Sequence, residues 1–172
     1  MPKDAIAVIM ERRSVRRYKS DPIPTEHLKT ILEAGRQAPS AGNRQPWQFI
    51  IVRDTEVKRA LGEACNGQTW IADADVIIAG LSLPQVSDRW HDKDVMIALQ
   101  NMILAATALG YGTCWIGAFN AEKVKQVLNI PEDVNVVALT PVGVPAEMPN
   151  ARPRKDASEI FFSDQYGKAL AL

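Results

Sequence analysis

The chain has 172 residues, 47% of them hydrophobic and 23% charged, and its 20 basic residues are balanced by 20 acidic ones. A general nucleic-acid or anionic-membrane surface would need an excess of positive charge, so this balance argues against both classes. At about 150 residues per domain, the length predicts a single domain over 1–172 that buries enough surface to fold without a staple.

Three features of the sequence favour the cytoplasm. The N-terminal residues lack the basic, apolar and cleavage regions of a signal peptide. The longest apolar stretch, 95–109, contains polar residues and is too short for the roughly 20 residues that span a membrane. Cys65 and Cys114 lie far apart, with no histidine at ligand spacing, which favours reduced core cysteines and no metal.

The chain opens with a predicted short helix that runs into a basic stretch. Asp4 can cap the helix, and its apolar residues recur at helical spacing: Ile6, Ile9 and Met10. Residues 11–18 then read E-R-R-S-V-R-R-Y. On a helical path like charges four residues apart would repel by a few tenths of a kcal/mol per pair, and a bound anion would reverse this. Guanidinium and hydroxyl donors suit phosphate or carboxylate, although a solvated basic face is the alternative.

The next segments predict a helix, a loop, a strand and another helix. Thr25 is the expected cap of a helix that carries Leu28, Ile31, Leu32 and Gly35 and ends at Pro39. Residues 39–46, P-S-A-G-N-R-Q-P, form a loop rich in small and amide residues. A strand is expected over 47–52, followed by a helix capped by Asp54 or Thr55.

The central part of the chain is strongly apolar. Residues 76–81 are a continuous apolar run of strand length, which indicates a sheet covered on both faces. From about Asp92 to Leu109 the sequence is apolar almost all round a helix, so we expect a central helix packed on every side. Strands are expected over 113–116 and 134–142, with a helix between them capped by Asn120.

Residues 145–172 differ from the rest of the chain. They contain prolines, a basic group and the pair Phe161-Phe162, without a period long enough for an independent element. A long irregular segment is uncommon within a compact fold, so we expect this tail to lie on a partner subunit.

Four segments of the sequence are rich in hydrogen-bond donors or small residues, and together they form a recognisable series along the chain. They are R-R-S-V-R at 12–16, P-S-A-G-N-R-Q-P-W at 39–47, G-Y-G-T-C-W-I-G at 110–117 and R-P-R at 152–154. Together they resemble the nitroreductase family of FMN-dependent oxidoreductases over nearly the whole chain. The resemblance implies an α+β fold: a mixed, mainly antiparallel sheet of four to five strands flanked by helices, with a long buried central helix and a tail exchanged in a homodimer.

The first and last motifs are similar to phosphate-binding segments of that family. The resemblance places the FMN phosphate and ribityl chain at Arg12, Arg13 and Ser14. It places Arg16 at the N1 and O2 edge of the flavin, where negative charge appears on reduction. Arg152 and Arg154 match a second pair of phosphate ligands, while Lys155 is as readily solvated and Arg17 is expected to face solvent.

The remaining implied contacts concern the flavin ring. Residues expected from the other subunit are Pro39, Ser40 and Asn43, with Gln45 as a less certain member. Asn66 matches an asparagine near the pyrimidine edge, with an ordinary loop asparagine as the alternative. The backbone amides of Ile116 and Gly117 match a turn near N5 and O4, where glycine permits close approach.

The implied activity is ping-pong transfer of hydride from NADH or NADPH, through flavin N5, to an electron-poor acceptor such as a nitroaromatic or quinone. Only about ten residues join the strand near Leu81 to the helix near Asp92, so a long lid is missing. The alternatives are a dehalogenating or flavin-fragmenting relative and a non-catalytic FMN-binding or storage protein. His91 and Trp115 remain open between structural roles and roles in the site.

Overall fold

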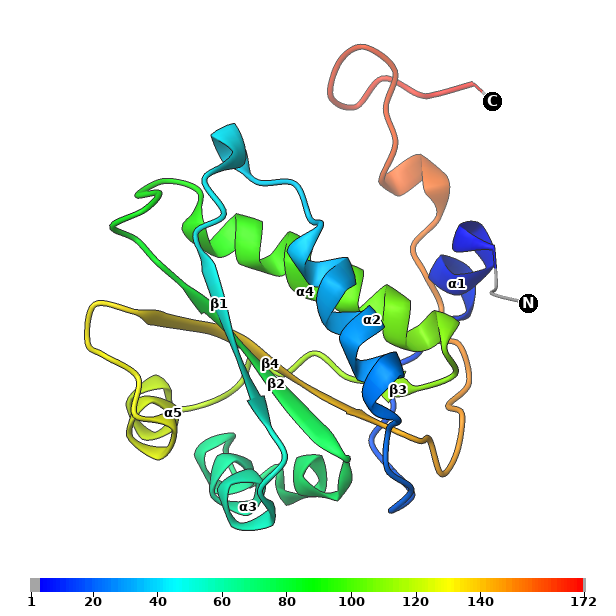
Figure 1. Ribbon diagram of the computed structural model, residues 1–172. Coiled ribbons are helices and arrows are strands. Elements are labelled where there is room, and N and C mark those ends of the chain that lie inside the picture. Colours follow the sequence, from blue (N-terminus) through cyan, green and yellow to red (C-terminus); the bar gives the residue numbers. More distant parts are fainter. Residues whose placement is uncertain (1–3, 172) are drawn as a thin grey trace.

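The computed structural model describes residues 4–171, and its centre is a four-stranded sheet (Figure 1). The strands are β1 (Trp47–Val52), β2 (Val76–Ser82), β3 (Gly112–Thr113) and β4 (Asn135–Gly143). They lie in the order β1-β2-β4-β3, and each neighbouring pair is antiparallel. Among the described residues, the parallel element is a single bridge from Ser14 to Thr113. The predicted mainly antiparallel sheet is confirmed.

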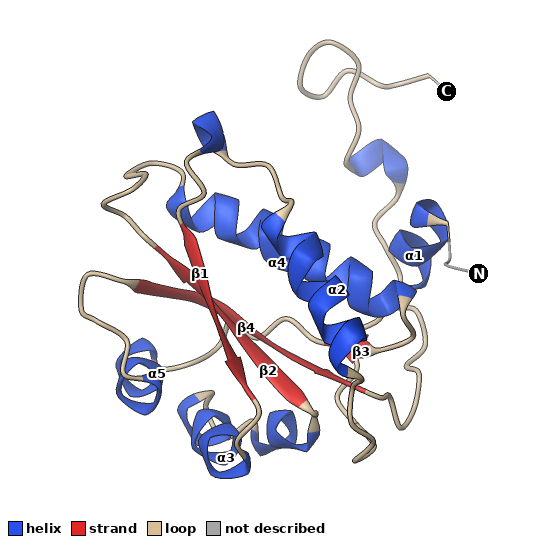
Figure 2. Cartoon of the chain, viewed as in Figure 1, coloured by secondary structure: helices blue, strands red, loops and turns tan. Residues whose placement is uncertain are grey.

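Helices cover both faces of this sheet (Figure 2). The α-helices are α1 (Ala5–Glu11), α2 (Thr25–Arg36), α3 (Thr55–Ala64), α4 (His91–Ala108) and α5 (Ala121–Leu128). Short 3₁₀ turns are η1 (Ala41–Asn43), η2 (Thr69–Asp73) and η3 (Ala157–Glu159). Helices α2 and α4 pack on one face, and α3, α5 and η2 pack on the other. Within the described residues, no helix has the length and apolarity needed to cross a membrane.

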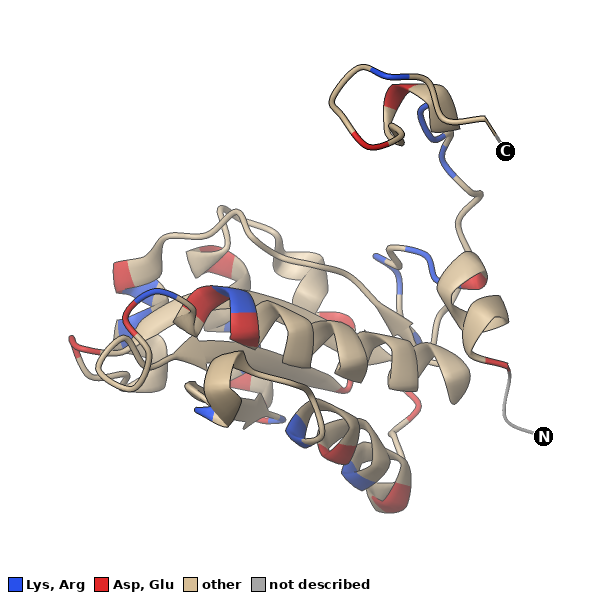
Figure 3. Ribbon diagram, turned by 90° about the horizontal axis from the view of Figure 1, so that it is seen from above, with Lys and Arg blue, Asp and Glu red and all other residues tan. Residues whose placement is uncertain are grey.

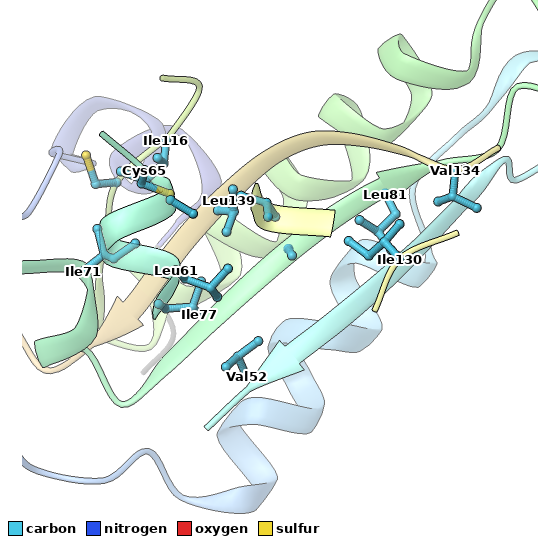
Figure 4. Packing of buried hydrophobic residues seen from close by; sticks show 14 residues of the cluster. Val52, Leu61, Cys65, Ile71, Ile77, Leu81, Ile116, Ile130, Val134 and Leu139 are labelled. Carbon is cyan, nitrogen blue, oxygen red and sulfur yellow. The ribbon is translucent and has the colours of Figure 1, made fainter. Parts of the chain in front are cut away.

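Strand β2 explains this layered arrangement. All seven of its residues are buried, as the continuous apolar run predicts. Successive side chains alternate, so Ile78 joins the α2/α4 layer. Ile77 joins the α3/α5 layer, which Figure 4 shows. Close packing needs small residues here: a Cβ on Gly35 would lie 2.1 Å from Met102 Cε, and one on Gly80 2.6 Å from Leu99 Cδ1.

Side-chain caps account for several helix starts. Asp4 accepts from the amide of Ile6, Asp54 from those of Glu56 and Val57, and Asn120 from that of Lys123. These predicted caps are confirmed. Thr25 is not a cap, because α2 starts one residue earlier than expected, with Pro24 at the N-cap and Thr25 already helical.

Three expectations need correction. Helix α1 ends at Glu11, so the arginine stretch is not helical. Strand β3 has only two residues, and the chain meets the sheet again through a bridge from Ile116 to Leu139. Seven of the 18 residues of α4 are buried, but Met96 and Ile97 are 50% and 41% exposed, so among the described residues this helix is not packed on every side as expected.

The tail, residues 145–172, begins against the body and then leaves it. The Ala146 amide donates to Arg17 O at 2.9 Å, which holds the start of the tail. Farther along, the chain projects away from the sheet in both views (Figures 1 and 3), and Phe161 is 55% exposed. Its described residues contain η3, a bridge from Pro145 to Tyr18 and a bridge from Phe162 to Ala169, in line with the predicted lack of long elements.

Candidate functional site

The arginine stretch is held to the sheet edge through Val15. This residue is buried, and its amide donates to Thr113 O at 2.9 Å. The Tyr18 hydroxyl donates to Val15 O at 2.8 Å, and burial raises the pKa of that phenol above its usual range. A Cβ on Gly112 would lie 2.8 Å from Val15 Cβ, so glycine allows the stretch to approach β3. Anchoring Val15 fixes the positions of the residues on either side of it.

Residues 12–16 and the start of the tail enclose a cavity of about 220 Å³, which we call the arginine pocket. Its lining is Arg12, Arg13, Ser14, Arg16, Pro149, Asn150, Arg152 and Arg154. Five guanidinium groups therefore surround the cavity, and the lining contains no carboxylate. The pocket brings together the first and last basic motifs, which are more than 130 residues apart in the chain.

The guanidinium groups of this pocket bond only to backbone carbonyls among the described residues. Arg13 Nη1 donates to Met10 O at 2.7 Å, and Arg154 Nη1 donates to Arg152 O at 3.3 Å. Arg17 differs: it lies outside the pocket, is 73% exposed and pairs with Glu147 at 3.2 Å, so its predicted solvent exposure is confirmed. Uncompensated like charges around one cavity favour an anionic ligand with several oxygens.

Arg16, which lines the arginine pocket, also contacts an aromatic residue of a neighbouring turn. Its Cζ lies 6.0 Å from the centroid of the Trp70 ring in η2. The nearby turn is tied to residue 118, because Gln68 Nε2 donates to Cys65 O at 2.9 Å and to Ala118 O at 3.1 Å. Trp70 and Gln68 were not identified from the sequence, because a lone aromatic and a lone amide in a loop carry no motif.

This tie joins the turn that contains Asn66 to the segment that contains Gly117. Asn66 is exposed in the turn with φ 57°, a left-handed value that asparagine tolerates. Gly117 is exposed, and a Cβ there would meet nothing within 4 Å. The Ile116 amide already donates to Leu139 O at 2.8 Å. The Gly117 amide makes no hydrogen bond within the described chain, so it is the one of the two that can donate to a ligand.

The amide loop, residues 39–46, is bonded to itself. Ser40 Oγ accepts from the Gln45 amide at 2.9 Å, and Gln45 Nε2 donates to Asn43 O and Oδ1, both at 3.3 Å. Gly42, Asn43 and Gln45 have φ values of 59°, 54° and 52°. Left-handed backbone at glutamine is unfavourable, and the loop's own hydrogen bonds hold it there.

Asp94 fastens the amide loop to the core. Its carboxylate comes from the first turn of α4, is 3% exposed and accepts from the Ala41 amide at 3.3 and 3.2 Å. Our sequence analysis missed this residue. Two acids in the first turn of an otherwise apolar helix, Asp92 and Asp94, were the available signal, because a buried carboxylate needs a donor.

The amide loop and the arginine pocket lie apart within one chain. Helix α4 has 18 residues and therefore extends about 27 Å. The loop lies near its first turn, whereas α1 and the arginine stretch that follows it lie near its other end (Figure 1). The chain therefore gathers the predicted basic residues, Asn66 and Gly117 on one side and leaves Pro39, Ser40, Asn43 and Gln45 on another.

His91 and Trp115 make structural contacts. Trp115 Nε1 donates to Gln100 Oε1 at 3.2 Å, and its ring packs against the α2/α4 layer. His91 Nδ1 lies 2.9 Å from Ser82 Oγ and 2.7 Å from Asp92 Oδ1. In the part of the chain that the structure describes, no three His, Cys, Asp or Glu side chains form a metal-like group.

Comparison with known proteins gives consistent matches. The model of the nitroreductase family matches residues 9–81 and 68–144. A protein from Methanothermobacter thermautotrophicus named NADH dehydrogenase/NAD(P)H nitroreductase is 35% identical over 164 residues, covering 91% of this chain and 85% of that protein. The FMN reductase [NAD(P)H] of Bacillus subtilis is 29% identical, with 95% and 74% covered. The crystal structure of a nitroreductase family protein from Clostridium novyi NT superimposes with a TM-score of 0.80 at 32% identity, with 97% of both chains covered.

Proposed function

The chain belongs to the nitroreductase family as an NAD(P)H-dependent flavin oxidoreductase, and from this premise we propose that it uses FMN to pass hydride from NAD(P)H to an electron-poor acceptor. Nitroaromatics and quinones are the acceptor class, and the two half-reactions follow a ping-pong order. The observation that carries the proposal is the arginine pocket, with five guanidinium groups and no carboxylate in its lining. The name of the Bacillus subtilis relative, FMN reductase, supports the choice of flavin.

The donor set of the pocket fits the phosphate of FMN. Arg12, Arg13, Ser14, Arg152 and Arg154 would hold the phosphate and ribityl chain, because guanidinium forks and a hydroxyl match phosphate oxygens. Each charged hydrogen bond of this kind contributes about 1.5–3 kcal/mol. Phosphate would also remove the repulsion among the five cations.

The ring would lie toward Arg16, Asn66 and Gly117. When bound, FMN supplies the redox chemistry, accepting and releasing hydride, and the chain supplies position and charge. The open surface at Gly117 would let its free amide donate to a ring atom. The positive charge of Arg16, held beside Trp70, would favour the reduced and more negative ring.

The site would be completed by a second copy of the chain. The separation of the amide loop from the arginine pocket supports contribution of Pro39, Ser40, Asn43 and Gln45 by the partner of a homodimer. Large apolar side chains exposed on α1, α4 and the tail support the same assembly: Ile6, Ile9, Met10, Met96, Ile97 and Phe161. We include in the proposal a single domain, a tail that wraps the partner, and the cytoplasm, for which two buried unpaired cysteines are the support.

Spectroscopy and rapid kinetics test the proposal. Purified protein should be yellow with an FMN spectrum, and NADH or NADPH should bleach it within seconds in a stopped-flow experiment. A menadione or nitrofurazone solution should then restore the colour without oxygen. A protein that binds FMN but is not bleached would be the FMN-binding or storage protein, and one that takes up no FMN contradicts the proposal altogether.

A further inference from the structure

A second cavity lies outside the flavin site just described, between the amide loop and the segment that joins β2 to α4. It has a volume of about 470 Å³ and is lined by Arg44 and residues 84–90. Sites for small molecules typically measure about 300–1,000 Å³, so a nucleotide fragment is within its range. We call it the loop pocket.

Hydrogen bonds beside the loop pocket fix the two segments that line it. The Leu83 amide donates to Pro46 O at 3.0 Å, which joins the two segments that form its walls. Ser82 Oγ donates to Asp92 Oδ1 at 2.6 Å, and His91 Nδ1 contacts both groups. Because these residues flank 83–90 on both sides, they close the loop at its neck. The pocket is therefore built by the fold before any ligand binds.

The charges of the loop pocket are mostly positive. Arg44 Nη1 donates only to Ala41 O at 3.3 Å, and the Arg89 side chain has no partner among the described residues. Asp88 is the one acid in the lining, and it forms no ion pair with either arginine. A third cation stands next to the pocket, where Lys93 Nζ lies 5.2 Å from the centroid of the Trp90 ring. Two guanidinium groups without a carboxylate partner at one cavity suit a phosphate.

Trp90 adds an aromatic surface to these charges. It lines the pocket and is 42% exposed, which is unusual for so large an apolar ring. Exposed tryptophan beside arginine is the combination that binds nucleotide bases, which stack on the ring while the phosphate meets the cation. Trp90 and Arg89 are neighbours in sequence, and Arg44 faces them from the amide loop.

We propose that the loop pocket binds the adenosine 2′-phosphate end of NADPH, which makes this chain selective for NADPH over NADH. This inference rests on the proposed function, because it needs NAD(P)H as the donor. Arg44 immediately follows Asn43, which the proposed dimer would bring to the flavin, so a nucleotide in the loop pocket would lie close in sequence to a flavin contact. The 2′-phosphate monoester, which NADH lacks, would be held by Arg44 and Arg89, and adenine would stack on Trp90.

Binding of nucleotide fragments tests this directly, without turnover. In calorimetry with FMN-loaded protein, 2′,5′-ADP should bind at least ten-fold more tightly than 5′-AMP. Arg44→Ala/Arg89→Ala should remove that preference, while Trp90→Leu should weaken both fragments alike. The matched control is Arg36→Ala, an exposed arginine paired with Glu33 on α2, which should change neither. Equal binding of both fragments to the unmodified protein, or a preference kept by the double variant, overturns the inference.

Stopped-flow reduction separates this inference from the proposed function. The double variant should need at least ten-fold more NADPH for half-maximal bleaching, with NADH little changed and the limiting rate retained. If NADPH and NADH bleach the unmodified protein at equal concentrations, the enzyme stands and the loop pocket inference fails. If neither nucleotide bleaches it although 2′,5′-ADP still binds through Arg44 and Arg89, the proposed function fails and the pocket stands.

Discussion

The arginine pocket has no carboxylate in its lining to pair with its guanidinium groups, whereas the amide loop bonds its polar groups to one another. In the pocket, five guanidinium groups repel each other, and the anchoring of Val15 positions those of Arg12, Arg13 and Arg16. In the loop, Ser40, Asn43 and Gln45 form a closed set of hydrogen bonds, and Asp94 holds the set to α4. The arginine pocket therefore needs an anionic ligand to balance its charge, whereas the amide loop keeps its shape through its own hydrogen bonds. Cofactor affinity should therefore depend mainly on the pocket, and cofactor geometry on the loop.

Removing two arginines should have the largest effect. Arg12→Ala/Arg154→Ala takes away two charged hydrogen bonds of about 1.5–3 kcal/mol each, so the Kd for FMN should rise about 100-fold or more. Fluorescence titration of FMN measures it. Arg17→Ala is the control, because Arg17 pairs with Glu147 outside the pocket. An equal loss of affinity in both variants would mean that general charge, rather than the pocket, binds the flavin.

Loss of the loop anchor should come next. Asp94→Ala leaves the partly buried Ala41 amide without an acceptor, which costs about 1–3 kcal/mol. At about 2–4 °C per kcal/mol for a chain of this size, thermal unfolding of the FMN-free protein should occur several degrees lower. Asp94→Asn retains an acceptor oxygen in the same shape and should recover much of the loss. Unchanged unfolding of Asp94→Ala would remove the anchoring role.

Substitution of Arg16 tests whether a positive charge beside the flavin ring changes the redox potential, as distinct from the affinity for the phosphate. Arg16→Ala should lower the flavin midpoint potential by about 30 mV, the two-electron equivalent of about 1.4 kcal/mol. Arg16→Lys should keep most of the potential, because it keeps the charge. Equilibration with a reference dye measures both variants. A potential that does not move in Arg16→Ala would leave Arg16 as a phosphate-side residue only.

Alkaline pH should destabilise the fold through its two buried cysteines. Burial raises the pKa of Cys65 to about 11, and burial also raises the pKa of Cys114 although Arg16, Ser14 and Arg12 lower it. A raised pKa contributes stability that is present below the ordinary value of 9.0 and is lost as pH rises toward 11. Urea unfolding should show a loss of about 1 kcal/mol between pH 8 and pH 10. Cys65→Ala should lose less over the same range, and an identical loss would assign the effect to other groups.

Local sequence patterns predicted the helices and strands, but they could not predict contacts between residues far apart in the chain. The apolar run of β2 and the caps Asp54 and Asn120 follow from neighbours in the chain, and the structure agrees. Asp94 could not be assigned, because its partner amide at Ala41 lies 53 residues away in a loop. The exposed Met96 was unexpected for a related reason: the sequence of an apolar helix does not say whether its cover comes from the same chain.

The candidate site also contains residues that the sequence predicted and contacts that it could not predict. Family resemblance placed Arg12 and Arg154 together, and the structure puts them around one cavity, which residue spacing alone could not have done. The Ile116 amide was assigned to the flavin from the resemblance, but it bonds to Leu139, and that pairing depends on how β4 approaches the chain. The loop pocket was not foreseen, because Arg44 and Arg89 belong to separate loops.

Mixing two defective variants tests the central claim, that one chain supplies the arginine pocket and its partner the amide loop. One variant is Arg12→Ala/Arg154→Ala and the other is Ser40→Ala/Asn43→Ala. In a mixed symmetric dimer, one site would combine the intact pocket of one chain with the intact loop of the other. Random reassembly of equal amounts should therefore restore about a quarter of the unmodified NADPH-bleachable FMN. No recovery above the two separate variants, with dimers confirmed by light scattering, would contradict the shared site.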